Sequence, residues 1–238
     1  MNISVKPVAV EEILAWRDLY RQEMNCQIVH DNMHARPGWT QPYRVEMDGS
    51  ATGYGSILIG GPWAGTRTAF EYYLTPAFRS RLFDGFETFL GASEATAIKA
   101  QTNDAVLTVL LHTWARNIVC ENIVFEDKLT TAHQVEGAVL RQRGAPDHDW
   151  VIEMSGAVAA NGGILYHYNR PYGDIYMEVV EGYRRRGMGS YVVQELKRIC
   201  YEGGSIPCAR CNPDNIASRR TLQRAGFVPC ASILSGDL

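Results

Sequence analysis

A short basic stretch with two glycines is the part of this chain best suited to chemistry. Residues 179–190 read Val-Val-Glu-Gly-Tyr-Arg-Arg-Arg-Gly-Met-Gly-Ser. Gly187 and Gly189 place no Cβ in the way of a ligand and tolerate positive φ, so successive backbone N–H groups can converge on phosphate oxygens. The positive end of a following helix would add to that field. The stretch therefore predicts a pyrophosphate site, with a merely solvated arginine run as the alternative.

The residues on either side predict a strand before this loop and a helix after it. Residues 174–180 are rich in β-branched and aromatic side chains and carry apolar residues at period two. From Met188 to Cys200 the apolar residues recur at helical spacing, and the pattern stops at Gly203-Gly204. A glycine pattern alone also occurs in structural turns, so a second signal is needed.

A second segment supplies that signal. Residues 206–227 read as a short strand, a polar turn that Asp214 or Asn215 can cap, and a helix that ends at Gly226. Together the two segments resemble the GNAT superfamily of N-acetyltransferases, whose motif is Arg/Gln-x-x-Gly-x-Gly followed by a strand, an Asn, a helix and Gly-Phe. Arg184, Gly187 and Gly189 fit the first part, and Asn215 fits the second.

The resemblance covers about residues 150–230 and implies acetyl-CoA or another acyl-CoA as acyl donor. It places the pyrophosphate on the glycine loop and the pantetheine arm between two splayed parallel strands, 174–180 and 206–211, in the manner of an added strand. The residues that it implies for donor binding are Val179, Arg184, Arg185, Arg186, Gly187, Met188, Gly189, Ser190, Asn215 and Ser218. A plain helix cap is the alternative for Asn215.

The resemblance also implies direct attack of an amine on the thioester, which requires a base for the amine and an acid for the departing thiolate. The family often places its acid seven residues after the Asn, and this chain has Leu222 there. It often places its base six residues before the position of Val179, where this chain has Gly173. Solvent or another tyrosine, such as Tyr172, Tyr176 or Tyr183, would then have to supply the proton.

The remaining catalytic candidates are Tyr172, Asp174 and Glu178. Strand alternation puts them on the face opposite Gly173, and a bulge is one way to turn Asp174 toward the cleft. The alternatives are salt-bridge partners for the two carboxylates and a wall residue for Tyr172. The aromatic residues 166–168 are expected to line the acceptor pocket, or to serve as packing.

The first half of the chain repeats the second. Residues 46–58 align without a gap on 153–165, and after a two-residue slip 74–84 align on 179–189. Leu82 and Asp84 then replace the two glycines, so a side chain and a negative charge stand where phosphate would sit. We therefore expect two GNAT-like modules, residues 1–127 and 128–238, of which only the second binds acyl-CoA. Chance similarity of two hairpins is the alternative.

The predicted fold class is α/β: a GNAT-like mixed, mostly antiparallel sheet with a splayed parallel strand pair, flanked by helices and duplicated. With 238 residues, 46% hydrophobic and 21% charged, the chain can form a sizeable core. A net charge of −3 makes nucleic acid an unexpected partner. No signal peptide or membrane span is expected, which favours the cytoplasm. No cysteine or histidine pattern completes a metal site, so none is predicted.

These observations predict an acyl-CoA-dependent N-acetyltransferase that transfers an acetyl group from acetyl-CoA to a primary amine, of a small molecule in the first instance. A non-catalytic acyl-CoA sensor and an acetyltransferase of a protein or peptide amine are the alternatives. The sequence leaves open whether the protein is a monomer or a homodimer.

Overall fold

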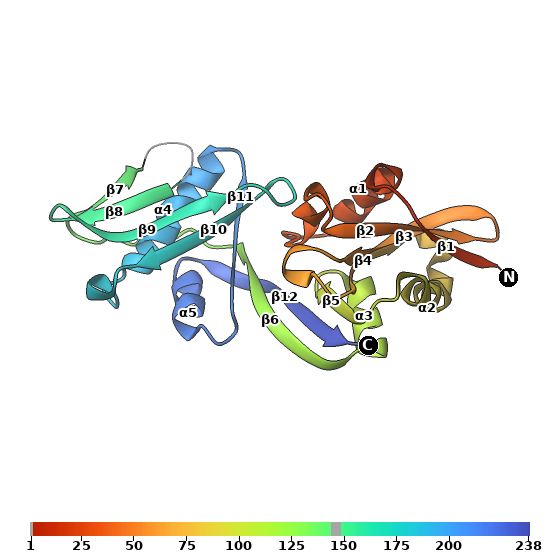
Figure 1. Cartoon of the computed structure of the whole chain (residues 1–238). Helices are drawn as coiled ribbons and strands as arrows, with labels where there is room; N and C mark the ends of the chain where they lie inside the picture. Colours follow the sequence, from red (N-terminus) through yellow and green to blue (C-terminus); the bar gives the residue numbers. More distant parts are fainter. Residues whose placement is uncertain (1, 144–148) are drawn as a thin grey trace. The chain divides into compact units, whose positions relative to one another are not determined.

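The structure, a computed structural model, describes residues 2–143 and 149–238 and divides into two compact units (Figure 1). Unit 1 comprises Met1–Glu121 together with Ser232–Leu238, and unit 2 comprises Asn122–Ala231. The chain thus leaves unit 1 after residue 121 and returns to it after residue 231. The sequence, in contrast, predicts a single boundary after residue 127.

The sheet of unit 1 has the strand order β1-β2-β3-β4-β5-β12. Its strands are β1 (Ile3–Pro7), β2 (Thr40–Met47), β3 (Ser50–Leu58), β4 (Thr68–Leu74), β5 (Ala97–Gln101) and the end of β12 (Phe227–Asp237). The neighbours are antiparallel except β4 and β5, which are parallel and pair only at Thr68–Ala97 and Ala69–Ile98. Beyond Ala69, β4 and β5 separate.

Helices cover both faces of this sheet, as Figure 1 shows. On one face, α2 (Leu82–Ser93) and α3 (Ala105–Trp114) bury Phe86 and Leu110 in a core with Tyr72. Alternation turns Tyr73 to the other face, where it packs in a second core with residues that precede and belong to α1 (Leu14–Glu23). The short helices of this unit are η1 (Val10–Ile13), η2 (Asp31–Ala35), η3 (Gly61–Trp63) and η4 (Pro76–Arg81).

The sheet of unit 2 has the order β6-β11-β10-β9-β8-β7. Its strands are β6 (Arg116–Asp127), β7 (Ala138–Gln142), β8 (Asp149–Met154), β9 (Ala157–Leu165), β10 (Tyr172–Val179) and β11 (Ile206–Cys211). Only β10 and β11 are parallel among these neighbours. The helix α4 (Met188–Glu202) packs with α5 (Ile216–Arg224) over a core that includes Ile175, Leu196 and Leu222, and η5 (Glu181–Tyr183) precedes α4.

Each unit is completed by a strand that the other half of the sequence supplies. In unit 1, β5 pairs along its length with the last residues of β12, from Ile233 to Asp237. In unit 2, β11 pairs with β6 from Ile123 to Glu126, immediately after the chain has left unit 1. Because of this exchange, each compact unit combines segments from both halves of the sequence.

Two backbone features show that the similarity of the halves is structural. The β2–β3 turn has Asp48 and Gly49 at φ of 50° and 82°, and the β8–β9 turn has Ser155 and Gly156 at the same two values. Positive φ at both central residues belongs to the tight hairpin turn that matches strand twist. Both hairpins also shift register at aligned positions, between Val45 and Glu46 and between Ile152 and Glu153. Two unrelated hairpins have no reason to share both features.

Candidate functional site

The parallel strands of unit 2 separate beside the glycine loop. Their pairing runs from Tyr172–Ile206 to Ile175–Ala209 and then stops, although β10 continues to Val179 and β11 to Cys211. Beyond Ile175, β10 keeps its antiparallel partner β9 on one side only. The splay predicted from the resemblance is therefore present, and its open side carries main-chain groups that an extended ligand can pair with.

The glycine loop leads directly into α4. Arg185 has φ of 62°, and Gly187, the N-cap of the helix, has φ of 80°. No side chain caps this helix, and within 2–143 and 149–238 the N–H groups of residues 187–190 donate to no other residue. A helix of this length leaves its first four N–H groups without an internal acceptor, and the helix dipole adds positive potential there. Main-chain donors without an internal acceptor can hold an anion at such a helix start.

The two glycines of the motif serve different purposes. A Cβ at Gly187 would meet only Val135, at 4.0 Å, so this residue is needed for its positive φ and for an open approach. A Cβ at Gly189 would lie 2.9 Å from Cγ2 of Thr221 on α5, and its φ is not positive. The sequence-based reason for Gly189, close approach of a ligand, is thus incomplete, because packing of α4 against α5 already requires a glycine there.

The three arginines of the loop are exposed, and one of them shapes it. Arg184 donates from Nε to the carbonyl oxygen of Val179, at 3.2 Å, which fixes the turn after β10. The guanidinium of Arg186 lies 5.8 Å from the ring centre of Tyr183. The side chains of Met188 and Ser190 are buried, with Ser190 Oγ donating to the carbonyl oxygen of Thr221 at 3.3 Å. Those two residues can therefore offer a ligand only main-chain groups.

Asn215 is the N-cap of α5, and its Oδ1 accepts from the N–H of Ser218 at 3.0 Å. The plain capping role is therefore present. Asn215 is exposed, and its side-chain nitrogen is not used in this bond, so a contact with a ligand remains compatible with the cap.

The predicted catalytic residues all lie on β10, and their surroundings differ. Asp174 is 3% exposed and accepts from Nε of Arg210 at 3.1 Å. Glu178 is exposed on the same face by alternation, and Tyr172 is half-buried where β10 begins. The pairing of β10 with β9 and β11 has no register shift, so the bulge considered for Asp174 is absent.

The structure also explains why this chain has no base and no acid at the two positions where the resembled family often places them. Gly173 faces α4, and a Cβ there would lie 2.8 Å from Sγ of Cys200, so no base can occupy it. Leu222 is 3% exposed within the core of unit 2, and it offers no proton donor.

Sequence reasoning missed Arg210 as a site residue and assigned Tyr168 no role beyond lining. Arg210 donates to Asp174 and also, from Nη2, to the hydroxyl oxygen of Tyr168. Its guanidinium lies 5.1 Å from the ring centre of Tyr168. In the sequence, the signal for this role is Arg210 itself, a charged residue inside the predicted strand 206–211. It becomes meaningful only when the parallel register sets Asp174 opposite Cys208.

The corresponding turn of unit 1 differs in conformation from the glycine loop. Arg79 donates from Nε to the carbonyl oxygen of Leu74 at 3.0 Å, the same contact that Arg184 makes to Val179 in unit 2. However, η4 runs directly into α2, and no residue from 75 to 84 has positive φ. The N–H of Leu82 donates to the carbonyl oxygen of Arg79, so a donor that a ligand would need is already satisfied.

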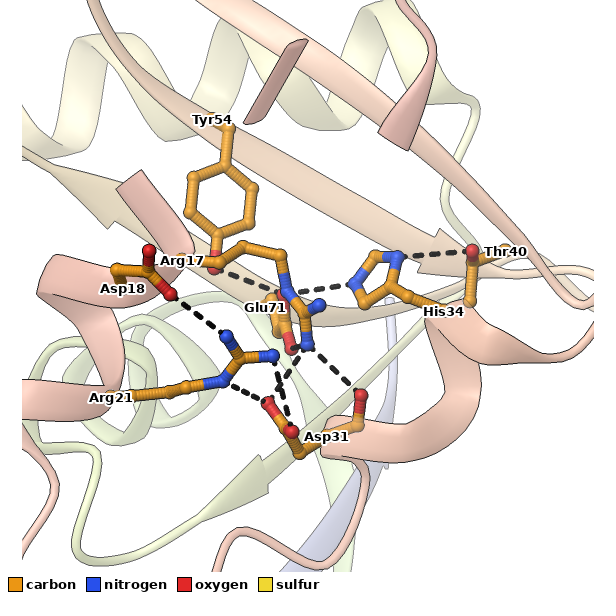
Figure 2. Close-up of polar contacts among 8 residues, drawn as sticks. All are labelled: Arg17, Asp18, Arg21, Asp31, His34, Thr40, Tyr54 and Glu71. Atoms are coloured by element: carbon orange, nitrogen blue, oxygen red, sulfur yellow. Dashed lines mark hydrogen bonds and ion pairs between the residues drawn. The ribbon is translucent and has the colours of Figure 1, made fainter. Parts of the chain in front are cut away.

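The face of the unit 1 sheet that packs against α1 contains a buried network of charged and polar side chains (Figure 2). Glu71 of β4 accepts from Nε of Arg17 at 3.3 Å and from the hydroxyl of Tyr54 at 3.0 Å, and it contacts Nε2 of His34 at 3.0 Å. Arg17 also donates to Asp31 at 2.9 Å. Burial would raise the pKa of Glu71, but the charge of Arg17 and the contact with His34 outweigh it and lower the pKa to about 2. Side chains of unit 1 itself thus provide the hydrogen-bond and ion-pair partners of Glu71.

Two further properties concern the ranges that the structure describes. No helix in 2–143 or 149–238 is long and apolar enough to cross a membrane. Within those ranges, no three His, Cys, Asp or Glu side chains are arranged to hold a metal ion.

Comparison with known protein families gives a match over the C-terminal half of the chain. The model of the acetyltransferase (GNAT) family matches residues 116–227, which include the splayed strands, the glycine loop and α5. A search of curated protein sequences finds no match.

Solved structures share the fold of the whole chain. A GNAT-family acetyltransferase from Colwellia psychrerythraea has a TM-score of 0.79 at 14% identity, with 99% of each chain covered. A tandem GNAT protein from the clavulanic acid biosynthesis pathway has a TM-score of 0.66 at 13% identity, with 99% of this chain and 98% of that chain covered. A GCN5-related N-acetyltransferase from Sphaerobacter thermophilus has a TM-score of 0.60 at 14% identity, covering 99% and 95%. The predicted GNAT-like fold class is confirmed.

Proposed function

Since residues 116–227 belong to the GNAT acetyltransferase family, we propose that unit 2 transfers an acetyl group from acetyl-CoA to a primary amine of a small molecule. The observation that carries this proposal is the combination of four unsatisfied N–H groups at residues 187–190 with the splay that opens beyond Ile175. The first feature suits the pyrophosphate and the second suits the pantetheine arm. We propose that unit 1 holds no acyl-CoA, because its corresponding turn lacks both positive φ and open donors.

The donor would contact the loop through residues with distinct roles. The main chain of Gly187, Met188, Gly189 and Ser190 would hold the pyrophosphate, and the exposed side chains of Arg185 and Arg186 would add positive charge. Val179 would pair with the pantetheine arm, and Asn215 would donate its side-chain amide to the same arm. Arg184 and Ser218 would maintain the turn and the cap that position these groups.

The reaction in this proposal is attack of a neutral amine on the thioester carbonyl, which releases the CoA thiol. Asp174, at the point where the strands separate, would accept the proton of the amine. Glu178 is exposed on the same face and would attract the cationic form of the acceptor, with Tyr172 forming part of the wall. Replacement of Asp174 by Asn and of Tyr172 by Phe tests these roles, and full turnover in both variants would remove them from the proposal.

Calorimetry with acetyl-CoA tests the donor site. Gly187→Leu places a side chain where φ is 80° and the approach is open, and we expect it to abolish binding. Gly204→Leu is the matched control, because Gly204 has φ of 75° and open space but follows the other end of α4. Binding by wild type and Gly204→Leu but not by Gly187→Leu supports the site. Absence of binding by wild type would refute it.

A second candidate function is favoured by a specific observation. Leu222 is in the core and Gly173 faces α4, so neither position at which the family often has its acid or its base carries a group that can transfer a proton. A protein that only senses acyl-CoA would need no such group. Release of CoA thiol in the presence of a panel of small amines and peptides separates the two functions. Turnover selects the enzyme, and the best acceptor in the panel decides between a small amine and a peptide. Binding with no turnover selects the sensor.

A further inference from the structure

The proposed reaction lacks a proton donor for the departing thiolate. Leu222 occupies the family's usual position for it and is buried in the core of unit 2. A donor must instead come from a side chain near the acyl end of the bound CoA. The place of that end follows from the geometry of the splay.

The acyl end lies near the last paired residues of the two parallel strands. An arm that enters from the loop after Val179 and pairs with β10 runs back toward Ile175, a distance of four residues or about 13 Å of strand. Pairing of β10 with β11 closes the gap at Ile175 and Ala209, so the arm ends there. The next residue of β11 is Arg210.

Arg210 stands at this closure on the face away from α4. Asp174 pairs with Cys208 in the parallel register, and alternation along β11 returns Arg210 to the side of Cys208. Its Nε donates to Asp174 at 3.1 Å, which confirms the side. The side chain of Arg210 is 31% exposed, whereas that of Asp174 is 4% exposed. A partly exposed cation is thus fixed beside the proposed base, next to the closure.

The same guanidinium holds a tyrosine. Arg210 donates from Nη2 to the hydroxyl oxygen of Tyr168, and the two groups also stack, with the guanidinium carbon 5.1 Å from the ring centre. An arginine only donates, so the phenol oxygen is the acceptor in this bond and the phenol's own proton is not used in it. Tyr168 is 9% exposed, which limits competition from bulk water.

Resting on the proposed function, we propose that Tyr168 is the general acid that replaces the missing family tyrosine and that Arg210 is its positioning residue. The amine nitrogen bonds to the carbonyl carbon, the C–S bond breaks, and its electron pair stays on sulfur. The O–H proton of Tyr168 moves to that sulfur and gives the thiol. Asp174 has taken the proton of the amine, and solvent returns this proton to the phenolate, so no net charge is left behind.

The other tyrosines considered from the sequence are less well placed. Tyr183 lies in η5 at the pyrophosphate end of the splay, beside Arg186. Tyr172 lies at the first pair of the parallel strands, below the closure. Tyr176 follows the closure on the open face, but it is 41% exposed, so bulk water competes for its hydroxyl.

The test compares leaving groups in Tyr168→Phe. With acetyl-CoA and the best amine of the panel, or water if no amine is accepted, we expect kcat to fall about 100-fold, a typical contribution of general acid catalysis. With 4-nitrophenyl thioacetate, whose aryl thiol leaves as a thiolate without a proton, Tyr168→Phe should match wild type. Arg210→Lys keeps the charge but cannot keep both the contact with Asp174 and the contact with Tyr168. Its kcat with acetyl-CoA should fall less than that of Tyr168→Phe, and its kcat with 4-nitrophenyl thioacetate should match wild type.

Tyr201→Phe is the matched control, since it removes an exposed hydroxyl of the same unit, at the end of α4 away from the glycine loop, and should leave both rates unchanged. Acetyl-CoA affinity, measured by calorimetry, verifies that each variant is folded. Full turnover of acetyl-CoA by Tyr168→Phe would overturn the inference and leave the proposed function standing, as would an equal loss with both donors. No thiol release by wild type would overturn the proposed function and the inference with it.

Discussion

Replacement of Asp104 by Asn should stabilise unit 1 at neutral pH and not in acid. Asp104 is the N-cap of α3, where its Oδ1 accepts from the N–H of Leu107 at 2.8 Å. It is 3% exposed, and burial raises its pKa from 3.8 to about 7, against the opposing hydrogen bonds from Leu107 and Tyr20. Asn offers the same cap acceptor but carries no charge. The substitution therefore removes the cost of the buried carboxylate while it keeps the cap bond to Leu107.

The magnitude follows from the shift in pKa. Between pH 3.8 and about 7 the folded protein keeps a proton on Asp104 that the unfolded chain has lost, so stability falls as the pH rises through this window. A shift of about three units corresponds to about 4 kcal/mol once the pH exceeds 7. The difference between Asp104→Asn and wild type should thus be close to zero near pH 4. From pH 5 to pH 8 it should grow by about 3 kcal/mol.

Urea unfolding followed by tryptophan fluorescence measures this difference. Four of the five tryptophans, Trp16, Trp39, Trp63 and Trp114, belong to unit 1, so the signal reports mainly on that unit. Asp84→Asn is the control, because it makes the same chemical change at an exposed carboxylate of the same unit. Parallel pH profiles of Asp104→Asn and wild type would refute the reasoning.

Four further predictions concern buried charge, packing and topology. Glu71→Gln removes one of the two carboxylates that neutralise the buried Arg17 and should destabilise unit 1 by about 3 kcal/mol, detected in the same fluorescence assay. Wild type itself should lose the contribution of Glu71 as the pH falls from 4.5 toward 2. Removal of residues 232–238 should expose the edge of β5 and accelerate hydrogen exchange there, while α4 keeps its protection. Gly189→Ala should lower the melting temperature through contact with Cγ2 of Thr221, and Thr221→Ser should restore it.

The sequence predicts the local structure of the glycine loop well because that structure depends on neighbouring residues. The loop is held by the φ values of Arg185 and Gly187 and by the start of a helix, and each depends on residues a few positions apart. Strand 206–211 and the cap at Asn215 are confirmed for the same reason. The internal repeat could also be read, because its hairpins preserve a turn and a bulge at aligned positions.

Features that depend on contacts between distant segments could not be predicted. The pairing of Arg210 with Asp174 requires the register of two parallel strands, which no local pattern encodes. The clash that requires Gly189 comes from Thr221, thirty-two residues further on. In unit 1, the residues around Glu71 indicate only a carboxylate on a strand. Its partner Arg17 comes from a helix fifty-four residues earlier, so the sequence near Glu71 does not predict the ion pair. Each of these features is set by tertiary packing.

The exchange of strands gives a physical reason for unit 1 to persist. Without β12, β5 would present an unpaired edge, and without β6, β11 would present one as well. An exposed edge strand offers a row of unsatisfied donors and acceptors that promotes association with other chains. Since β6 begins in unit 1 and β12 begins in unit 2, neither unit could be deleted without opening the sheet of the other. The strand exchange is thus a reason to retain the sheet of unit 1, whether or not its turn after β4 holds a ligand.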